Sequence, residues 1–307
     1  MERFSFSSAL LHFVNTKGPG GFVWKWLLAN AVIVGGATII FMYFYFNALA
    51  PFLGMAATGA EPTPEEALSI MGPIFGMGML AMPVGMVLMA MFETSALRRY
   101  VRNEGFSLKF GKEELRTIGV YFLWIGAFIL TFIIMMIAMV VLSAVTIVAT
   151  AASPESAFVV TIIIQLLIYA PLVYFGVRLA PAAALTLRDG KVKFSSAFKV
   201  TKGRFWKLFG AYIIVYLAMY LVTTILQIAA LAMLFGSTLA AGGDFSTVDM
   251  NGIFQSPVAF AGFGVILLAY VLQMALTQFI FMGIASRTVI TDPDWDGNVS
   301  STAEVFD

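Results

Sequence analysis

The sequence predicts an all-α, polytopic membrane protein with six transmembrane helices, amphipathic interfacial helices and a threefold internal repeat of helix pairs. Composition is the first observation behind this fold. The 307 residues are 60% hydrophobic and only 11% charged, with a mean hydropathy of +0.92, whereas soluble domains carry about twice that charged fraction. The second is a set of six long charge-free stretches, and the third is the placement of the basic residues around them.

Each charge-free stretch is long enough to cross a bilayer, which requires about 20 residues in a helix. Backbone groups in lipid must be satisfied within their own segment, so apolar stretches of this length form helices. The stretches without Asp, Glu, Lys or Arg cover residues 26–60, 67–92, 117–154, 156–177, 208–243 and 250–286.

The basic residues indicate the orientation of these helices. All 18 Lys and Arg residues precede the first span, follow the sixth, or lie in the second and fourth connections. The other three connections carry acidic residues only. Because positively charged loops remain in the cytoplasm, we expect both termini and the two basic loops on the cytoplasmic side of a bacterial inner membrane.

In order along the chain, the sequence predicts one transmembrane domain over residues 1–288 and an acidic, mobile cytoplasmic tail over 289–307. The repeat units are expected at about 1–93, 94–178 and 179–288. Within them we place the spans at 22–47, 70–92, 117–148, 156–178, 205–236 and 257–284.

A short surface segment is expected to precede the first span of each repeat. FSSAF at 194–198 matches FSSAL at 6–10 and, more weakly, FSLKF at 106–110, while Trp206-Lys207 matches Trp24-Lys25. In the third repeat the apolar positions have helical spacing, which predicts an amphipathic helix lying at the bilayer surface. These positions are Phe194, Phe198, Thr201 and Phe205.

No catalytic or metal-binding group can be assembled from the sequence, and no cofactor is predicted. Cysteine is absent and His12 is the sole histidine, so the usual zinc ligand set is missing. We expect His12 at the headgroup level. A methionine stripe in the second span resembles a soft-metal path, but adaptable packing is the favoured interpretation; it comprises Met79, Met82, Met86 and Met89.

Two further features of the spans bear on mechanism. Glu93, at the end of the second span, is predicted to form an ion pair with Arg98, and the glycines of this span are expected to allow close helix approach.

Spans four to six carry polar stripes that either hold the helices together by hydrogen bonds or line a pocket. The candidate lining residues are Gln165, Tyr169, Tyr212, Tyr216, Tyr220, Gln227, Gln273 and Thr277.

The basic loops are the strongest functional feature of the sequence. Lysine and arginine alternate there with aromatic residues, a mixture that suits anionic lipid headgroups at a membrane surface. Because these residues are tied to the membrane plane, a nucleic-acid partner is not expected. The predicted headgroup-binding residues are Arg98, Arg99, Arg102, Lys109, Lys191, Lys193, Lys199, Lys202, Arg204, Lys207 and Trp206.

The motif TKGRFWKLFG at 201–210, with FSSAF before it and an apolar helix after it, resembles the membrane domain attached to some glycerophosphodiester phosphodiesterases. It is also similar to bacterial six-span proteins of the YciC type. The resemblance implies a six-span membrane domain. The histidine and metal-binding carboxylate motifs of the phosphodiesterase catalytic domain have no counterpart here, so no catalytic residue is carried over.

These observations predict a non-enzymatic inner-membrane protein that binds or organises anionic phospholipid, or that scaffolds a membrane-protein partner or a second copy of itself. The alternative is a transporter or channel for a small or amphipathic solute, through a polar pocket between spans four and six. A continuous polar cavity would favour the alternative, and tight packing at those residues would count against it.

Overall fold

The computed structural model describes residues 4–16, 18–58, 63–152, 154–240 and 257–295, and every regular element within these ranges is helical. Six helices there are long and apolar enough to cross a membrane, which confirms the predicted all-α fold with six candidate spans and indicates a multi-pass membrane protein. They lie at Phe22–Pro51, Pro64–Arg102, Lys112–Val140, Phe158–Asp189, Phe205–Ala232 and Gly264–Ile290.

Short helices alternate with long ones along the chain. The first span is interrupted by a π-helical turn, η1, between α3 and α4. The elements are α1 (Phe6–Leu10), α2 (His12–Asn15), α3 (Phe22–Ala29), η1 (Asn30–Val34), α4 (Gly35–Thr58), α5 (Pro64–Arg102), α6 (Lys112–Ala152), α7 (Pro154–Leu179), α8 (Ala182–Asp189), α9 (Ala197–Val200), α10 (Phe205–Ala240) and α12 (Pro257–Ile290).

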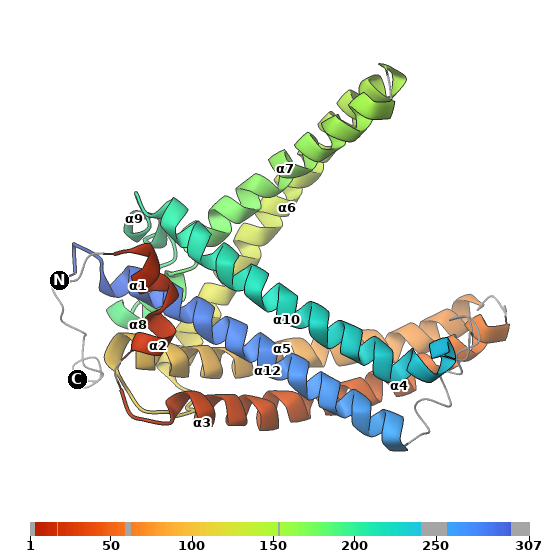
Figure 1. Cartoon of the computed structure of the whole chain (residues 1–307), viewed down its shortest axis with the longest axis horizontal. Helices are drawn as coiled ribbons and strands as arrows, with labels where there is room; N and C mark the ends of the chain where they lie inside the picture. Colours follow the sequence, from red (N-terminus) through yellow and green to blue (C-terminus); the bar gives the residue numbers. More distant parts are fainter. Residues whose placement is uncertain (1–3, 17, 59–62, 153, 241–256, 296–307) are drawn as a thin grey trace.

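The long helices converge at one end of the molecule, where the short helices also lie (Figure 1). From there, α6 and α7 leave together as a hairpin, while α4, α5, α10 and α12 run in another direction (Figure 1). We call the shared end the hub and define it as residues 4–16, 18–21, 93–116, 178–204 and 284–295.

Helix α5 shows how the hub is joined to a span. It begins in a capping box, in which Thr63 Oγ1 accepts from the Glu66 amide and Glu66 Oε2 accepts from the Thr63 amide, and Pro64 suits the first helical position. It ends at Asn103, whose φ of 57° is left-handed. Its 39 residues extend about 58 Å, more than a bilayer of about 40–45 Å. The helix therefore continues beyond the predicted 70–92 span into the hub.

Burial is concentrated in and beside the hub. Residues 94–101 of α5 and all but the last residue of α8 are buried, whereas no more than 22% of any span's most apolar window is buried. At the boundary, the Trp26 indole N–H donates to the Phe92 carbonyl at 3.0 Å and the Tyr100 hydroxyl donates to the Phe279 carbonyl at 2.9 Å. The best-packed core of the molecule thus lies at one end of the spans.

The predicted surface helices are wrong in detail. Residues 194–205 do not form one helix: α9 has four residues, and Gly203, with a φ of 72°, separates it from α10. Residues 106–110 are not helical, and residues 6–15 form two short helices. Polar contacts explain the break, because Arg178 occupies the Phe198 and Thr201 carbonyls that a continuous helix would use, and the buried Thr201 hydroxyl donates to the Arg178 carbonyl. The threefold repeat stays a prediction.

Three local predictions also need correction. Glu93 accepts a hydrogen bond from the Tyr121 hydroxyl instead of pairing with Arg98. His12 is buried, with its ring 5.4 Å from that of Tyr100. The glycines of α5 do not mark close contacts in the described structure, because a Cβ placed on any of them would meet nothing within 4 Å; they are Gly72, Gly76, Gly78 and Gly85.

The predicted mobile tail is wrong for its first part. α12 continues to Ile290, and both Thr291 and Asp292 are buried against the hub. Asp292 forms an ion pair with Arg188, and Trp295 lies under the same guanidinium. Residues 296–307 of the tail, and 241–256 between the predicted fifth and sixth spans, lie outside the described residues.

Candidate functional site

The hub contains a buried cluster of arginines. Arg98 Nε donates to Glu113 at 2.7 Å, and its Nη2 contacts Glu114, whose side chain is only 1% exposed. Arg102 donates to Glu113 at 2.7 Å and to the Leu187 carbonyl at 2.9 Å. These contacts join the end of α5 to the start of α6 and to α8, and they satisfy charges that would otherwise be buried alone.

Other arginines of the hub bind backbone carbonyls. Arg99 donates to the Pro19 carbonyl at 3.2 Å and lies over the Phe22 ring. Arg178 donates to the carbonyls of Thr201 and Phe198, at 3.1 and 2.7 Å. The guanidinium fork suits this role because it offers five donors in a fixed plane.

Arg188, in α8, and Arg204, directly before α10, both bind the end of α12. Arg188 donates to Asp292 at 3.1 Å and to the Val289 carbonyl at 3.2 Å. Arg204 donates to the carbonyls of Thr288 and Thr291, at 3.0 and 2.7 Å. Burial lowers the pKa of Arg204, although nearby Asp292 opposes this effect.

The predicted headgroup-binding residues therefore divide into two groups. Arg98, Arg99, Arg102 and Arg204 make contacts inside the protein, as described above. The lysines lie outside: Lys193 is partly exposed, and Lys109, Lys191, Lys199, Lys202 and Lys207 are exposed, as is Trp206. Headgroup binding by any of them stays a prediction, and the exposed group is the one whose side chains can reach a ligand.

Two tryptophan–lysine pairs lie at the starts of spans. Trp206 is 77% exposed at the start of α10 and Trp24 is 78% exposed at the start of α3. The lysine that follows each, Lys207 and Lys25, is also exposed. Exposed indole rings and lysines at a helix end are typical of the membrane–water interface.

Lys199 has an acidic neighbour. Its Nζ lies 2.8 Å from Asp294, and this hydrogen bond raises the pKa of Lys199 and lowers the pKa of Asp294. Both side chains are more than 60% exposed, so solvent screens the pair. Lys202 and Lys207 are exposed beside it in sequence, and together with Trp206 these three lysines define what we call the lysine surface.

The predicted polar lining residues are not gathered in one place. Gln165 and Tyr169 are exposed on α7, while Tyr216, Tyr220 and Gln227 are exposed on α10. The other three lie between α10 and α12: Tyr212 packs on Phe281, Gln273 donates to the Met219 carbonyl at 3.5 Å, and Thr277 donates to the Gln273 carbonyl.

Among the described residues, no group of three or more His, Cys, Asp or Glu side chains is placed to hold a metal ion.

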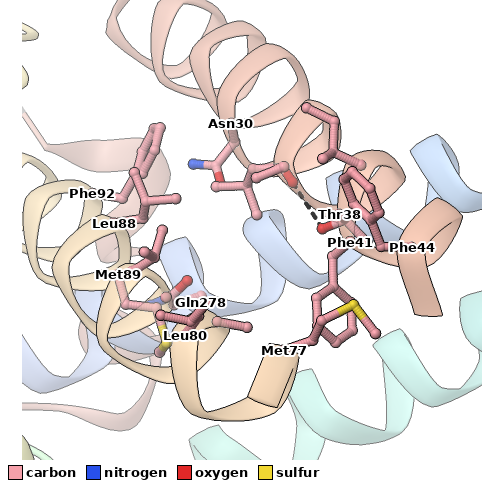
Figure 2. Close-up of a pocket in the computed structure, with 16 residues that line it drawn as sticks. Asn30, Thr38, Phe41, Phe44, Met77, Leu80, Leu88, Met89, Phe92 and Gln278 are labelled. Atoms are coloured by element: carbon pink, nitrogen blue, oxygen red, sulfur yellow. Dashed lines mark hydrogen bonds between the residues drawn. The ribbon is translucent and has the colours of Figure 1, made fainter. Parts of the chain in front are cut away.

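The methionine stripe of α5 is not packed against other helices as expected. Met79 and Met82 are 78% and 67% exposed, and Met89 is 52% exposed. Met89 instead borders a cavity of about 710 Å³ between α4 and α5, to which Asn30 and Gln278 contribute their amides (Figure 2).

Sequence reasoning missed two features of this region. The first is the separation of buried arginines from exposed lysines, for which the residue types themselves were a signal, because arginine is favoured in buried pairs. Glu113 and Glu114, at the start of a span, were a second signal for those pairs. The cavity had a weaker signal in Asn30, an amide within an apolar span.

Comparison with family models, with curated proteins and with solved structures gives no significant match for this chain. The resemblance to six-span proteins of the YciC type therefore stays a prediction.

Proposed function

We propose that this protein binds anionic phospholipid at the cytoplasmic face of a bacterial inner membrane, through the lysine surface. The observation that carries the proposal is the exposure of Trp206 and Lys207 at the start of a candidate span. An aromatic side chain and a basic side chain at the start of a span contact the lipid headgroups when the helix crosses the membrane. Lys202 adds a second exposed positive charge five residues earlier in the chain.

The equivalent Trp24-Lys25 pair supports the same placement. Both tryptophans are exposed, although each adjoins a tightly packed part of the protein: Trp26 and Leu208 are fully buried. An exposed indole ring beside a packed helix start has its favourable environment at the headgroup level. The proposal assigns no chemical reaction to the site.

The test compares two double variants with equal charge loss. Lys202→Gln/Lys207→Gln alters the lysine surface, whereas Lys109→Gln/Lys191→Gln removes two exposed lysines from other loops. Native mass spectrometry in detergent would count retained phosphatidylglycerol and phosphatidylcholine. Because a basic residue near a lipid surface contributes about 1 kcal/mol, the first variant should bind phosphatidylglycerol about 30-fold more weakly.

Phosphatidylcholine binding should stay unchanged in both variants, because the lost interaction is electrostatic. Arg204 is left intact, since its loss would break contacts with Thr288 and Thr291. Equal retention of phosphatidylglycerol by the wild type and Lys202→Gln/Lys207→Gln would refute the proposal. An equal loss in both double variants would show a diffuse charge effect and would also count against it.

A second candidate function, self-association as a scaffold, is favoured by the exposed polar face of α10. Tyr216 and Tyr220 stack at 6.3 Å between ring centroids and are about 60% exposed, and Gln227 is exposed on the same helix. An amide in lipid needs a partner. Since an amide both donates and accepts, the same face of a second copy can pair with it.

The cysteine-free sequence makes this second candidate simple to test. A single Tyr220→Cys variant in bilayers should form a disulfide-linked dimer under mild oxidation, and Gln227→Leu added to it should reduce the dimer yield. A Tyr169→Cys variant, on α7, serves as the control. Equal cross-linking at both positions would exclude a specific α10 interface.

A further inference from the structure

A cavity of about 710 Å³ lies between α4 and α5, away from the lysine surface. We propose that it binds one acyl chain of a glycerolipid, with the Asn30 amide donating a hydrogen bond to the ester carbonyl of that chain. The site would select a lipid by its tail and ester, whereas the lysine surface would select a headgroup, so the two proposals stand independently.

The size and lining of the cavity suit a lipid tail. Its volume falls within the range of about 300–1,000 Å³ found for small-molecule sites. None of the 16 lining residues is charged, so a neutral ester is a better ligand than an ionised carboxylate. Apolar side chains form most of the wall; the larger ones include Phe41, Phe44, Met77, Leu80, Leu88 and Met89.

The length of the cavity also fits. Its lining extends from Asn30 to Phe44 in the first span and from Phe92 back to Met77 in α5. At 1.5 Å per residue each stretch measures about 21 Å. The hydrocarbon part of one leaflet, half of a core of about 30 Å, is only about 15 Å thick. A chain that fills one leaflet can therefore be accommodated over its whole length.

The polar end of the cavity is what distinguishes it from an ordinary gap between helices. Asn30 is only 5% exposed, and its Nδ2 has no hydrogen-bond partner in the protein. Figure 2 shows this nitrogen directed toward the space between the helices. Thr38 differs, because its hydroxyl already donates to the Val34 carbonyl at 2.8 Å. A buried donor without an acceptor is unfavourable, so a ligand with an acceptor at this point gains affinity.

The local backbone contributes to this arrangement. Asn30 begins the π-helical turn η1, which ends at Val34. Such turns widen a helix by one residue and occur frequently at functional sites. Asn30 also lies about 12 Å along the helix from its start at Phe22. This is several ångströms beneath an interfacial layer of about 5–8 Å, so the amide lies on the hydrocarbon side of the level where glycerol esters meet the tails.

The cavity can be entered from within the membrane. Ile40, Leu80 and Val84 border it and are each more than half exposed. In a bilayer these side chains would face hydrocarbon, so a lipid tail can enter sideways without crossing water. The second tail and the headgroup of the same lipid would remain in the surrounding leaflet.

The decisive experiment uses the full chain in vesicles of phosphatidylcholine that contain a trace of phosphatidylcholine with a photoreactive group in one acyl chain. Mass spectrometry would then map the labelled peptides. We expect labelling to concentrate on α4 and α5, and Gly85→Leu to abolish it by filling the cavity. Gly85 accepts a side chain without a clash, since a Cβ there meets nothing within 4 Å.

Gly76→Leu is the matched control. Gly76 is on the same helix and equally unobstructed, but it does not line the cavity and, nine residues away, it points to the opposite side of the helix. This variant should label like the wild type. The Lys202→Gln/Lys207→Gln variant should also label normally, which separates the result from the proposed lysine surface.

The role of Asn30 is tested by competition. Ester-linked phosphatidylcholine should displace the probe from the wild type about fivefold better than ether-linked phosphatidylcholine, as expected for one net hydrogen bond. Asn30→Leu should remove this difference while leaving some labelling. A free fatty acid should compete poorly. Labelling spread evenly over all spans, or unchanged by Gly85→Leu, would show annular lipid only and overturn the proposal.

Discussion

The hub and the membrane spans are built by different rules, although the same helices pass through both. In the hub, buried arginines bind carboxylates and carbonyls from segments far apart in sequence, such as Arg188 with Asp292 and Arg102 with Leu187. In the spans, few residues are buried: no more than 22% of any apolar window. The α6–α7 hairpin even leaves the hub separately from the other long helices (Figure 1).

The difference follows from what each environment offers a side chain. Lipid tails are as apolar as a leucine side chain, so an apolar residue gains little free energy when it moves from lipid into a protein contact. A buried guanidinium requires a specific partner, because an unpaired buried charge raises the free energy of the folded state. The hub therefore specifies which segments meet, whereas the apolar spans specify only that the chain crosses.

The largest effect is expected from removing one partner of the Arg98 ion pairs. Arg98→Met leaves Glu114 buried without its cation, which should lower the free energy of unfolding by about 3–5 kcal/mol. Lys202→Met, at an exposed position, should have no measurable effect. Unfolding in mixed micelles with increasing dodecyl sulfate would measure both. Similar stability of the two variants would show that the hub is not the stabilising region.

Alanine substitutions on α5 compare the two regions within one helix. Leu97 is 1% exposed in the hub, and Met79 is 78% exposed in the span. Leu97→Ala should cost about 2–5 kcal/mol because it leaves a cavity, whereas Met79→Ala should change stability by less than about 0.5 kcal/mol. The same micelle titration applies. A large loss with Met79→Ala would indicate a helix partner on that face.

Arg204→Lys tests whether the hub requires the guanidinium or merely a positive charge. A lysine cannot reproduce the paired contacts with the Thr288 and Thr291 carbonyls, so stability should fall by about 1–2 kcal/mol. Lys207→Arg, an exposed substitution in the opposite direction, is the control and should be neutral. If both changes were neutral, charge alone would suffice at position 204.

The smallest effect is expected at the Lys199–Asp294 pair. The lysine lowers the pKa of Asp294, so any contribution of the pair is present at neutral pH and is lost as the pH falls through that lowered pKa. Both groups are exposed, so Asp294→Asn should leave the unfolding temperature unchanged at pH 7. A clear loss at pH 7 that disappears in high salt would contradict this screening argument.

The fold was predictable where one physical requirement dominates. Charge-free stretches such as 117–154 must form membrane-crossing helices, and the structure has its candidate spans there. The ends of the helices were less predictable. Thr94–Val101 looks polar in sequence, yet it is buried because its neighbours in α6, α8 and α12 supply partners that are distant along the chain.

The candidate sites show the same limit. Spacing alone predicted a continuous surface helix through Phe198 and Thr201, but tertiary hydrogen bonds between Arg178 and these two residues compete with its backbone bonds. Counting basic residues did not distinguish the buried Arg98 from the exposed Lys202. The cavity at Asn30 depends on how α4 and α5 are placed against each other, and no pattern within either helix encodes that placement.

The contacts of Arg188 and Arg204 with the end of α12 have a consequence for biosynthesis. Their acceptors, which include the carbonyls of Thr288 and Val289, belong to the last segment of the described chain to leave the ribosome. Until that segment arrives, Arg204 lacks these carbonyl acceptors and Arg188 retains the neighbouring Asp189, so this side of the hub forms only after the end of α12 has been made. A nascent or truncated chain that lacks residues 284–292 would leave Arg204 without these acceptors, and we expect its hub to stay open.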